Sequence, residues 1–402
     1  MRILVPNLGS TSLKYQLIET DGESVLARGK IDRIGGAESQ VITWERGRPE
    51  ESRSTAQIPD HRAAIKILID HLAGLGGEGD AHQGISAVGF KAVHGGPHYC
   101  GSFLIDDQLL AAMQEFVTVA PAHNPIYIQA MNIFRDLLPG VPMVAVFETG
   151  FHATIPDYAS SYGVPYEWRE KYGVRRYGFH GSSHRYIGQR VPQILGRPAE
   201  GLRLVSCHLG GSSSICAIKD GKSVDISHGF SPQSGLEQSS RAGDLDSFAV
   251  LEIMDREKLS PAEMRRVLAK NGGLAGISGL SNDVRDLEQA GAQGHTRAAI
   301  ALAVFIYQIK KHIGAYAAAM GGLDAVAFAG GIGENSWRTR QQVCSHMEFL
   351  GMQLDDVANR LESRVDRIIS APGSPVSILV VYTNEELMVA RETMRVLCAD
   401  AQ

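Results

Sequence analysis

Cysteine is scarce in this 402-residue chain, which has only Cys100, Cys207, Cys216, Cys344 and Cys398. Their number is odd, and no two of them form a C-x-x-C pair. This pattern excludes a disulfide framework and argues against a structural zinc site. We therefore expect free thiols in a reducing compartment, which indicates a cytoplasmic protein.

Long hydrophobic runs are also missing. No window offers 18 consecutive apolar residues, the length that marks a membrane-spanning helix. The first residues lead directly into a predicted strand, without the pattern of a signal peptide. We expect neither a membrane segment nor a targeting segment.

An excess of charge is absent too. The chain has 39 basic and 44 acidic residues, a formal net charge of −5, which argues against non-specific binding of nucleic acid. The hydrophobic fraction of 44% is that of a globular protein, and this length favours two domains.

The histidines lack the spacing of a transition-metal site. Neither an H-E-x-x-H motif nor a paired Cys/His spacing occurs among them. The histidines considered are His94, His98, His123, His152, His180, His184 and His208.

Residues 204–224 contain the stretch around which the chain is organised. An apolar run leads into Gly210-Gly211 and three serines, a second apolar run follows, and Asp220-Gly221 is a hairpin turn signal. A strand, glycine turn and strand direct backbone N–H groups and hydroxyls into one small space, which suits phosphate. Taken alone, the stretch fits an ordinary hairpin better.

The same plan occurs about 200 residues earlier, in residues 4–13, and Asp21-Gly22 there corresponds to Asp220-Gly221. Similarity at a fixed offset indicates an internal duplication. It predicts two similar domains whose hairpins face each other across a cleft and hold a polyphosphate.

Periodicity predicts an α/β protein, in which residues 143–147 are a strand buried on both faces that ends at Glu148. We expect residues 46–57 to be a loop and Ser182 to cap a helix. Strands are expected at 2–6, 12–19, 24–33, 39–45, 85–93, 143–147, 203–227 as a meander, 325–329 and 376–381. Helices are expected at 60–75, 106–119, 124–138, 183–195, 245–257, 261–270, 295–319 and from 385 onward.

Four polar stretches hold candidate site residues, each with a plainer alternative. Residues 328–333 suit a nucleotide or a strand–helix turn, and residues 281–286 suit a nucleotide or a helix cap with surface charge. His180 suits phosphate or a packed histidine. Arg241 suits an anion, which a guanidinium binds with two bonds, or a solvated loop.

Taken together, motifs along the whole chain resemble the acetate kinase family, which includes acetate and propionate kinases. The matching stretches are Asn7-x-Gly9-Ser10-x-Ser12-Leu13-Lys14, Val93-His94-Gly95-Gly96, His123-Asn124-Pro125, Arg176-Tyr177-Gly178-Phe179-His180-Gly181-x-Ser183-His184, Cys207-His208-Leu209-Gly210, Asp220-Gly221-Lys222-Ser223-Val224-Asp225, Arg241-x-Gly243-Asp244, Gly331-Ile332-Gly333-Glu334-Asn335 and Thr383-Asn384-Glu385-Glu386-Leu387.

The resemblance implies two duplicated actin-like ATPase (ribonuclease H-like) domains with a cleft between them. Residues 1–150, completed by a C-terminal helix at 385–402, would form one domain, and residues 151–384 the nucleotide-binding domain. The implied reaction is reversible phosphoryl transfer from ATP to a short-chain carboxylate, giving an acyl phosphate and ADP. A homodimer and Mg²⁺, with Mn²⁺ as an alternative, are implied as well.

Roles follow residue by residue from the resemblance. His180 and Arg241 would stabilise the transferring phosphoryl group. Asn7 and Glu385 would hold Mg²⁺, which needs few protein oxygens. The further catalytic candidates are Glu148 and Lys91. The acceptor would contact Lys91, Val93, Ala122, His123 and Pro232. The nucleotide would contact Lys14, His208, Leu209, Gly210, Gly211, Ser212, Asp283, Val284, Arg285, Gly331, Ile332, Gly333, Glu334 and Asn335.

Several residues depart from the family pattern, mostly at the acceptor end. Lys91 replaces an arginine and so lacks its planar fork. Glu148 replaces an aspartate, and Ala122 replaces a leucine, which would widen the acyl pocket. The remaining departures are Phe90 for His, Gly210-Gly211-Ser212 for Gly-Asn-Gly, Ile226 for Thr, His228 for Met, and Gln238-Ser239 for Met-Gly.

Two hypotheses of different class follow. The first is an ATP-dependent carboxylate kinase, acting on acetate or another short-chain carboxylate, whose acceptor or efficiency differs from that of standard acetate kinase. The change to Ala122 favours a longer acid such as propionate or butyrate. The second is a catalytically weakened, nucleotide-binding paralogue, which the changes at Lys91 and Glu148 motivate. The apolar helix at 295–319 would lie in a dimer interface or in the core.

Overall fold

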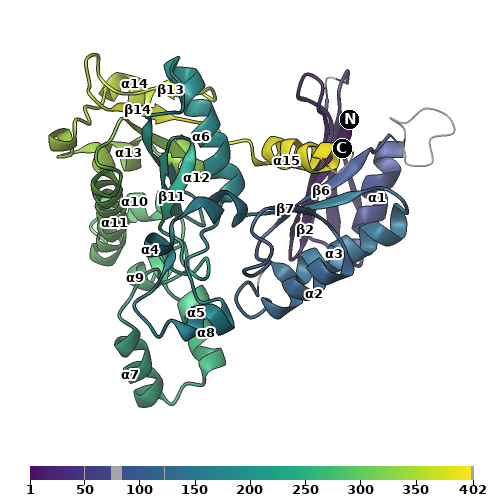
Figure 1. The fold of residues 1–402 in the computed structure, drawn as a ribbon, viewed down its shortest axis with the longest axis horizontal. Helices are drawn as coiled ribbons and strands as arrows, with labels where there is room; N and C mark the ends of the chain where they lie inside the picture. The colour runs from purple at the N-terminus through teal and green to yellow at the C-terminus, as the bar shows by residue number, and fades with distance from the viewer. Residues whose placement is uncertain (49, 74–83, 122, 400–402) are drawn as a thin grey trace. The chain divides into compact units, whose positions relative to one another are not determined.

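The computed structural model describes residues 1–48, 50–73, 84–121 and 123–399, and the chain divides into two compact units (Figure 1). Unit 1 comprises Met1–Gly150 and Asn384–Gln402, and unit 2 comprises Phe151–Thr383. Each unit contains one β-sheet with helices packed against it, so the predicted α/β class is confirmed.

The described part of unit 1 forms a sheet in the order β5-β4-β3-β2-β1-β6-β8-β7. Its strands are β1 (Arg2–Gly9), β2 (Ser12–Glu19), β3 (Ser24–Asp32), β4 (Ser39–Glu45), β5 (Ser52–Ala56), β6 (Ala87–Ala92), β7 (Ser102–Leu104) and β8 (Met143–Phe147). Its helices are α1 (His61–Ala73), α2 (Asp107–Glu115), α3 (Asn124–Leu137) and α15 (Glu385–Ala399).

Strand β1 shows how this sheet is buried on both faces. Successive side chains of a strand point to opposite faces. Leu4 and Leu8 therefore pack with α1 and α3, whereas Ile3 and Val5 pack with α15. The last helix of the chain thus completes the core of the unit that the first strand begins.

The described part of unit 2 forms a sheet in the order β11-β10-β9-β12-β14-β13. Its strands are β9 (Arg203–His208), β10 (Ser214–Lys219), β11 (Lys222–Ile226), β12 (Ala325–Ala329), β13 (Arg367–Ile368) and β14 (Ser377–Val380). Its helices are α4 (Asp157–Ser160), α5 (Glu167–Tyr172), α6 (Gly181–Leu195), α7 (Ser247–Glu257), α8 (Pro261–Lys270), α9 (Gly273–Ser278), α10 (Val284–Ala292), α11 (Thr296–Met320), α12 (Gly330–Asn335), α13 (Trp337–Cys344) and α14 (Asp356–Arg360), with 3₁₀ turns η1 (Gly150–Thr154), at the boundary of the two units, and η2 (Glu348–Leu350).

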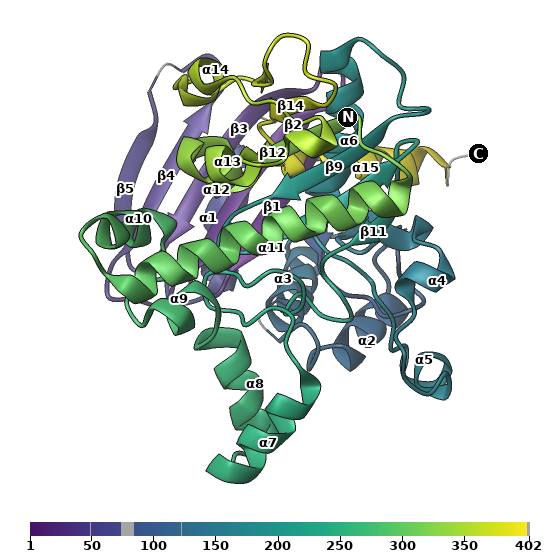
Figure 2. The same ribbon diagram turned by 90° about the vertical axis from the view of Figure 1, so that its left-hand side faces the viewer.

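Helices α6 and α11 cover opposite faces of this second sheet, and Figure 2 shows α11 crossing one face. Phe305 and Ile309 of α11 pack with Val326 and Phe328 of β12. Helix α11 is long and apolar enough to cross a membrane, but this is weak evidence because the core helices of soluble proteins often have the same length and composition. Its packing on the sheet accounts for its apolar face.

The two sheets share one topology. In each, a three-stranded antiparallel meander is followed by two parallel strands: β3-β2-β1-β6-β8 in unit 1 and β11-β10-β9-β12-β14 in unit 2. This agreement supports the internal duplication. The turn at Asp220-Gly221 is also confirmed, with φ values of 54° and 72° that suit a two-residue hairpin.

Two local predictions are wrong. Residues 46–57 are not all loop, because β5 pairs with β4 as an edge strand whose side chains are all exposed, so no apolar alternation marks it. Ser182 does not cap α6, since the helix already begins at Gly181, with His180 in the left-handed conformation at the cap position.

Leu209 joins two glycine-containing segments of unit 2. Its N–H donates to the Ala329 carbonyl at 2.8 Å, and its carbonyl accepts from the N–H groups of Ile332 at 2.8 Å and Gly333 at 3.2 Å. Gly330 lies so close, at φ +74°, that a Cβ there would stand 2.7 Å from the Leu209 oxygen. The junction therefore requires glycine at position 330.

Replacing Gly330 with alanine is expected to lower the free energy of unfolding by about 2–3 kcal/mol, because left-handed strain and a backbone clash add. The matched control is Gly331→Ala, since a Cβ there would meet nothing within 4 Å. Thermal unfolding measures both variants, and equal melting temperatures for them would contradict the assigned role.

Candidate functional site

A cavity of about 670 Å³ lies within unit 2. It brings together most of the predicted nucleotide residues from three separate stretches of the sequence. Those on its wall are Gly210, Gly211, Asp283, Val284, Arg285, Gly331, Ile332 and Asn335. The Leu209 junction holds two of these stretches side by side.

At one end of the cavity, Asp283 caps α10. Its Oδ1 accepts from the Arg285 N–H at 2.9 Å, and the Arg285 guanidinium donates back at 3.0 Å. These hydrogen bonds hold the pKa of Asp283 below its usual range. The capping interpretation of this stretch is correct, and the same residues line the cavity.

The β9–β10 hairpin turn lies at the other end. Ser213 Oγ accepts from the Gly210 N–H at 3.1 Å and donates to the Gly210 carbonyl at 3.0 Å, which fixes the turn. Ser212 Oγ accepts from Arg241 Nη1 at 3.0 Å. The hairpin and the predicted phosphoryl-binding arginine are therefore in direct contact.

Several histidines of unit 2 are hydrogen-bonded to serines. His180 Nδ1 is hydrogen-bonded to Ser214 Oγ at 2.8 Å, and His208 Nδ1 to Ser183 Oγ at 2.7 Å. The His180 and His208 rings lie 4.2 Å apart between centroids. Burial keeps the pKa of the neighbouring His184 well below its usual value, so that ring is neutral.

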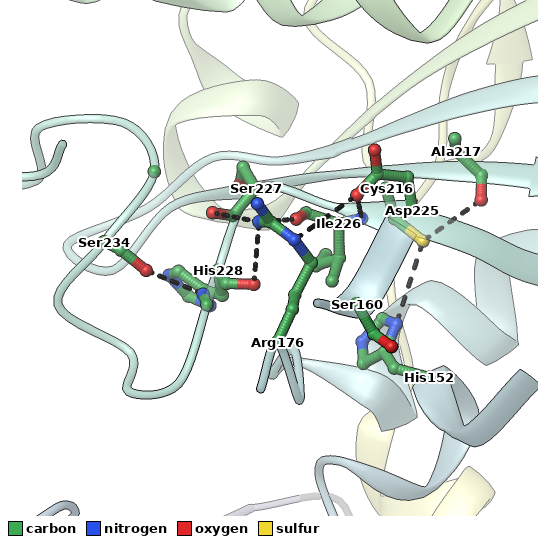
Figure 3. Close-up of polar contacts among 12 residues, drawn as sticks. His152, Ser160, Arg176, Cys216, Ala217, Asp225, Ile226, Ser227, His228 and Ser234 are labelled. Carbon is green, nitrogen blue, oxygen red and sulfur yellow. Dashed lines mark hydrogen bonds and ion pairs between the residues drawn. The ribbon is translucent and has the colours of Figure 1, made fainter. Parts of the chain in front are cut away.

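Arg176, from the motif before α6, fixes the strand end that leads to His228 (Figure 3). Its Nη1 donates to the carbonyls of Ile226 at 2.6 Å, Ser227 at 3.3 Å and His228 at 3.4 Å. Its Nε lies 3.6 Å from Asp225 Oδ1. Arg176 therefore supports the site through the backbone.

In unit 1, Asn7, Lys91 and Glu385 border one small gap, which has no room for a water molecule. Lys91 Nζ donates to Glu385 Oε2 at 2.5 Å. Burial alone would lower the pKa of Lys91, but the carboxylates of Glu385 and Glu148 outweigh it and raise that pKa. Lys91 is therefore charged.

The remaining acceptor candidates follow the ends of strands. Glu148 follows β8, is 4% exposed, and its N–H donates to the Ala92 carbonyl at 2.8 Å. Val93 follows β6 and is buried. His123 begins α3, and Ala122 lies outside the described residues.

The predicted magnesium residues supply an amide and a carboxylate oxygen, which are ligand types that suit Mg²⁺, but the gap between them has no room for the waters that this cation keeps. The ammonium group of Lys91, which is paired with Glu385, would compete with a metal ion for that carboxylate. No cluster of three or more His, Cys, Asp or Glu suited to a metal occurs in the described residues. A sparse oxygen site is therefore the type of metal site that these residues support.

Lys14 pairs with Asn7 across β1 and β2 and lines a separate cavity of about 240 Å³ with Asn7 and Trp44. Sequence reasoning missed Tyr127, whose hydroxyl lies 3.4 Å from Asn7 Oδ1, and it had no motif to find it by. Gln238 was noticed only as a departure, although the structure places it beside Arg241.

The nucleotide-sized cavity, the hydroxyl-rich hairpin and the half-buried arginine that contacts it define a phosphotransferase of the α/β class. The chain belongs to the acetokinase family, whose model matches residues 2–391. It is 46% identical over 398 residues to an acetate kinase of Desulfitobacterium hafniense and 47% identical over 401 residues to one of Thermotoga maritima, and in both pairs 99% of each chain is covered.

Solved structures agree with this assignment. The acetate kinase of Porphyromonas gingivalis has a TM-score of 0.88 at 39% identity, over 98% of this chain and 99% of that one. A propionate kinase from Francisella tularensis has a TM-score of 0.88 at 34% identity, over 97% and 98%. The predicted fold class of duplicated actin-like domains is thereby confirmed.

Glu237, beside the site, supplies a test of pH dependence. It is 5% exposed, and its Oε1 lacks a hydrogen-bond partner among the described residues. Burial raises the pKa of its carboxyl from the ordinary 4.5 to about 7. Folded protein therefore keeps a proton that the unfolded chain releases between these values, so stability is full below pH 4.5 and falls as pH rises to 7.

The variant Glu237→Gln carries no titrating group, so it is expected to exceed the natural protein in stability by about 3 kcal/mol at pH 8. The difference should disappear near pH 4.5. Melting temperatures measured at both values check this, and a difference that does not depend on pH would contradict it.

Proposed function

We propose that this protein is a carboxylate kinase of the acetate kinase type, which reversibly transfers the γ-phosphoryl group of ATP to a short-chain carboxylate and yields an acyl phosphate and ADP. The observation that carries the proposal is the continuous wall in unit 2 from Asp283 through Gly211 to Ser212 and Arg241. Phosphoryl transfer depends mainly on positioning and charge stabilisation, and this wall provides both.

The chemistry assigned to unit 2 is the stabilisation of the transferring group. Arg241 and His180 would donate hydrogen bonds to its equatorial oxygens, where negative charge is spread. Burial lowers the pKa of Arg241, and a guanidinium remains charged even so. The backbone around Gly210 and Gly211 would contact the nucleotide phosphates, and the stretches at 283–285 and 331–335 the adenosine.

Unit 1 would supply the cation and acceptor groups. Asn7 and Glu385 would hold Mg²⁺, which would supply positive charge to offset the negative charge of the nucleotide phosphates. Lys91 would bind the acceptor carboxylate as a point charge, and its raised pKa keeps that charge. Val93 and His123 would line the acyl chain.

We further propose that the preferred acceptor is longer than acetate, because Ala122 stands where the family resemblance implies leucine. The experiment is a coupled assay of acids with two to five carbons, with ATP and Mg²⁺. Propionate or butyrate is expected to exceed acetate in kcat/KM by about tenfold, since one methylene in a pocket is worth about 1–3 kcal/mol. Equal or better turnover of acetate would remove the larger-acid proposal.

The control for the reaction itself is Arg241→Ala. It is expected to lower kcat by about 10²–10³, as the loss of one stabilising donor does elsewhere, while calorimetry still shows ATP binding. Binding of ATP by the natural protein without turnover of any acid would contradict the kinase proposal and favour the weakened paralogue instead.

We propose a homodimer that works in the cytoplasm. The five cysteines are all free, which suits a reducing compartment. Helix α7 projects from unit 2 together with α8, and it has no buried residue (Figure 2). Phe248 and Leu251, three positions apart on one face of the helix, are 78% and 56% exposed, and this apolar pair favours contact with a second copy.

The variant Phe248→Asp is therefore expected to shift the protein from dimer to monomer in light scattering, without a loss of melting temperature. Phe349→Asp is the matched control, because Phe349 is also 78% exposed but lies in η2. A Phe248→Asp protein that remains dimeric at micromolar concentration would contradict this interface.

A further inference from the structure

Three departures from the family pattern, Ser212, His228 and Gln238, come from separate stretches of the sequence but belong to one polar network in unit 2, and a fourth, Ser239, lies beside it. Gln238 is its centre and is fully buried. Its Oε1 accepts from Ser212 Oγ at 2.7 Å, from Arg241 Nη1 at 3.2 Å and from the Ser213 N–H at 3.4 Å. Its Nε2 donates to the Pro232 carbonyl at 3.0 Å.

The orientation of the Gln238 amide is fixed by chemistry. A guanidinium and a backbone N–H only donate, so the group facing Arg241 and Ser213 must be the oxygen. The nitrogen then faces Pro232 and lies 3.4 Å from His228 Nε2. His228 Nε2 must therefore accept, which requires a neutral ring.

His228 suits this acceptor role. Burial, together with the positive charge of Arg241, keeps the pKa of His228 well below its usual value. Arg176 holds the His228 carbonyl at 3.4 Å, so the ring is positioned from its own backbone. The His228 ring also lies 5.1 Å from that of His180. The network thus extends from Arg241 to the predicted catalytic histidine.

Arg241 depends on this network for its position. Its Nη1 has three acceptors, Ser212 Oγ, the Pro232 carbonyl and Gln238 Oε1, and Gln238 itself hydrogen-bonds the other two. Next to it, the Ser239 N–H donates to the Gly211 carbonyl at 3.2 Å, and a Cβ at Gly211 would stand 3.6 Å from Ser239 Oγ. The side chain lost at 211 and the one gained at 239 therefore occupy neighbouring space.

We propose that Gln238 is a positioning residue that holds Arg241 in place for phosphoryl transfer and ties it to Pro232 and His228 on the acceptor side. This inference rests on the proposed kinase function. It assigns one physical role to the residues at 212, 228 and 238, which form a hydrogen-bonded set.

The test compares Gln238→Met, which has similar length but no hydrogen bonds, with the natural protein. We expect kcat to fall about 10- to 100-fold while KM for ATP changes less than threefold, because a misplaced group affects the transition state most. Ser240→Ala is the matched control, since Ser240 Oγ bonds the Ala269 carbonyl outside the network, and it should change kcat less than twofold.

A double variant separates positioning from a general structural role. In an Arg241→Ala background, Gln238→Met should lower kcat less than twofold further, because the group it positions is gone. An equal loss in both backgrounds would overturn the inference. If Gln238→Met does not fold, Gln238→Asn keeps a polar amide in the buried site but withdraws it by one methylene, and the same pattern is expected.

The two proposals fail in different ways. An active natural protein whose Gln238→Met variant retains kcat within twofold overturns the inference alone. A natural protein that turns over no acid overturns the proposed function, and this inference with it.

Discussion

The candidate site of unit 2 depends on the three hydrogen bonds of the Leu209 backbone. They fasten the turn after β9 to the segment after β12, and parallel pairing of these strands brings both segments to one edge of the sheet. Residues more than 100 positions apart thus form one cavity wall. Gly330 permits the close approach that this requires. The position of the β9–β10 hairpin is therefore set by the sheet and not by the hairpin sequence itself.

The sequence predicted most of the architecture because its signals are physical and local. The continuously apolar residues 143–147 and 325–329 are buried strands with those bounds, and the repeated hairpin pattern corresponds to the shared topology of the two sheets. The sequence did not predict β5, because both faces of this edge strand are exposed to solvent and its residues therefore show no alternation of apolar and polar side chains. The prediction of Ser182 as a cap was wrong because α6 begins at Gly181, so the cap position is occupied by His180 and Ser182 already lies in the first turn.

The site was predictable in its residue types but not in its connections. Motif spacing located Arg241 and the Gly331–Asn335 stretch. In the structure Arg241 contacts Ser212 of the hairpin, and part of the Gly331–Asn335 stretch lines the same cavity as residues 283–285. No sequence rule reports that Ser212 and Gln238 touch, because they are separated by β10, β11 and a loop. The pairing of Lys91 with Glu385 was hidden for the same reason, since 294 positions separate them.

When the departures from the family pattern are considered one position at a time, each suggests a loss of catalytic function. Gly-Asn-Gly has lost an amide, and two methionines have become polar. In the folded unit, however, the fully buried Gln238 amide is hydrogen-bonded through its oxygen to Ser212 and lies with its nitrogen 3.4 Å from His228 Nε2, so these polar side chains are partners of one another. Such pairing is not expected of an idle site, because a Gln238 amide without these partners would be a poorly satisfied polar group beside Arg241. The network therefore argues that Arg241 is held in position by surroundings that differ from the family pattern.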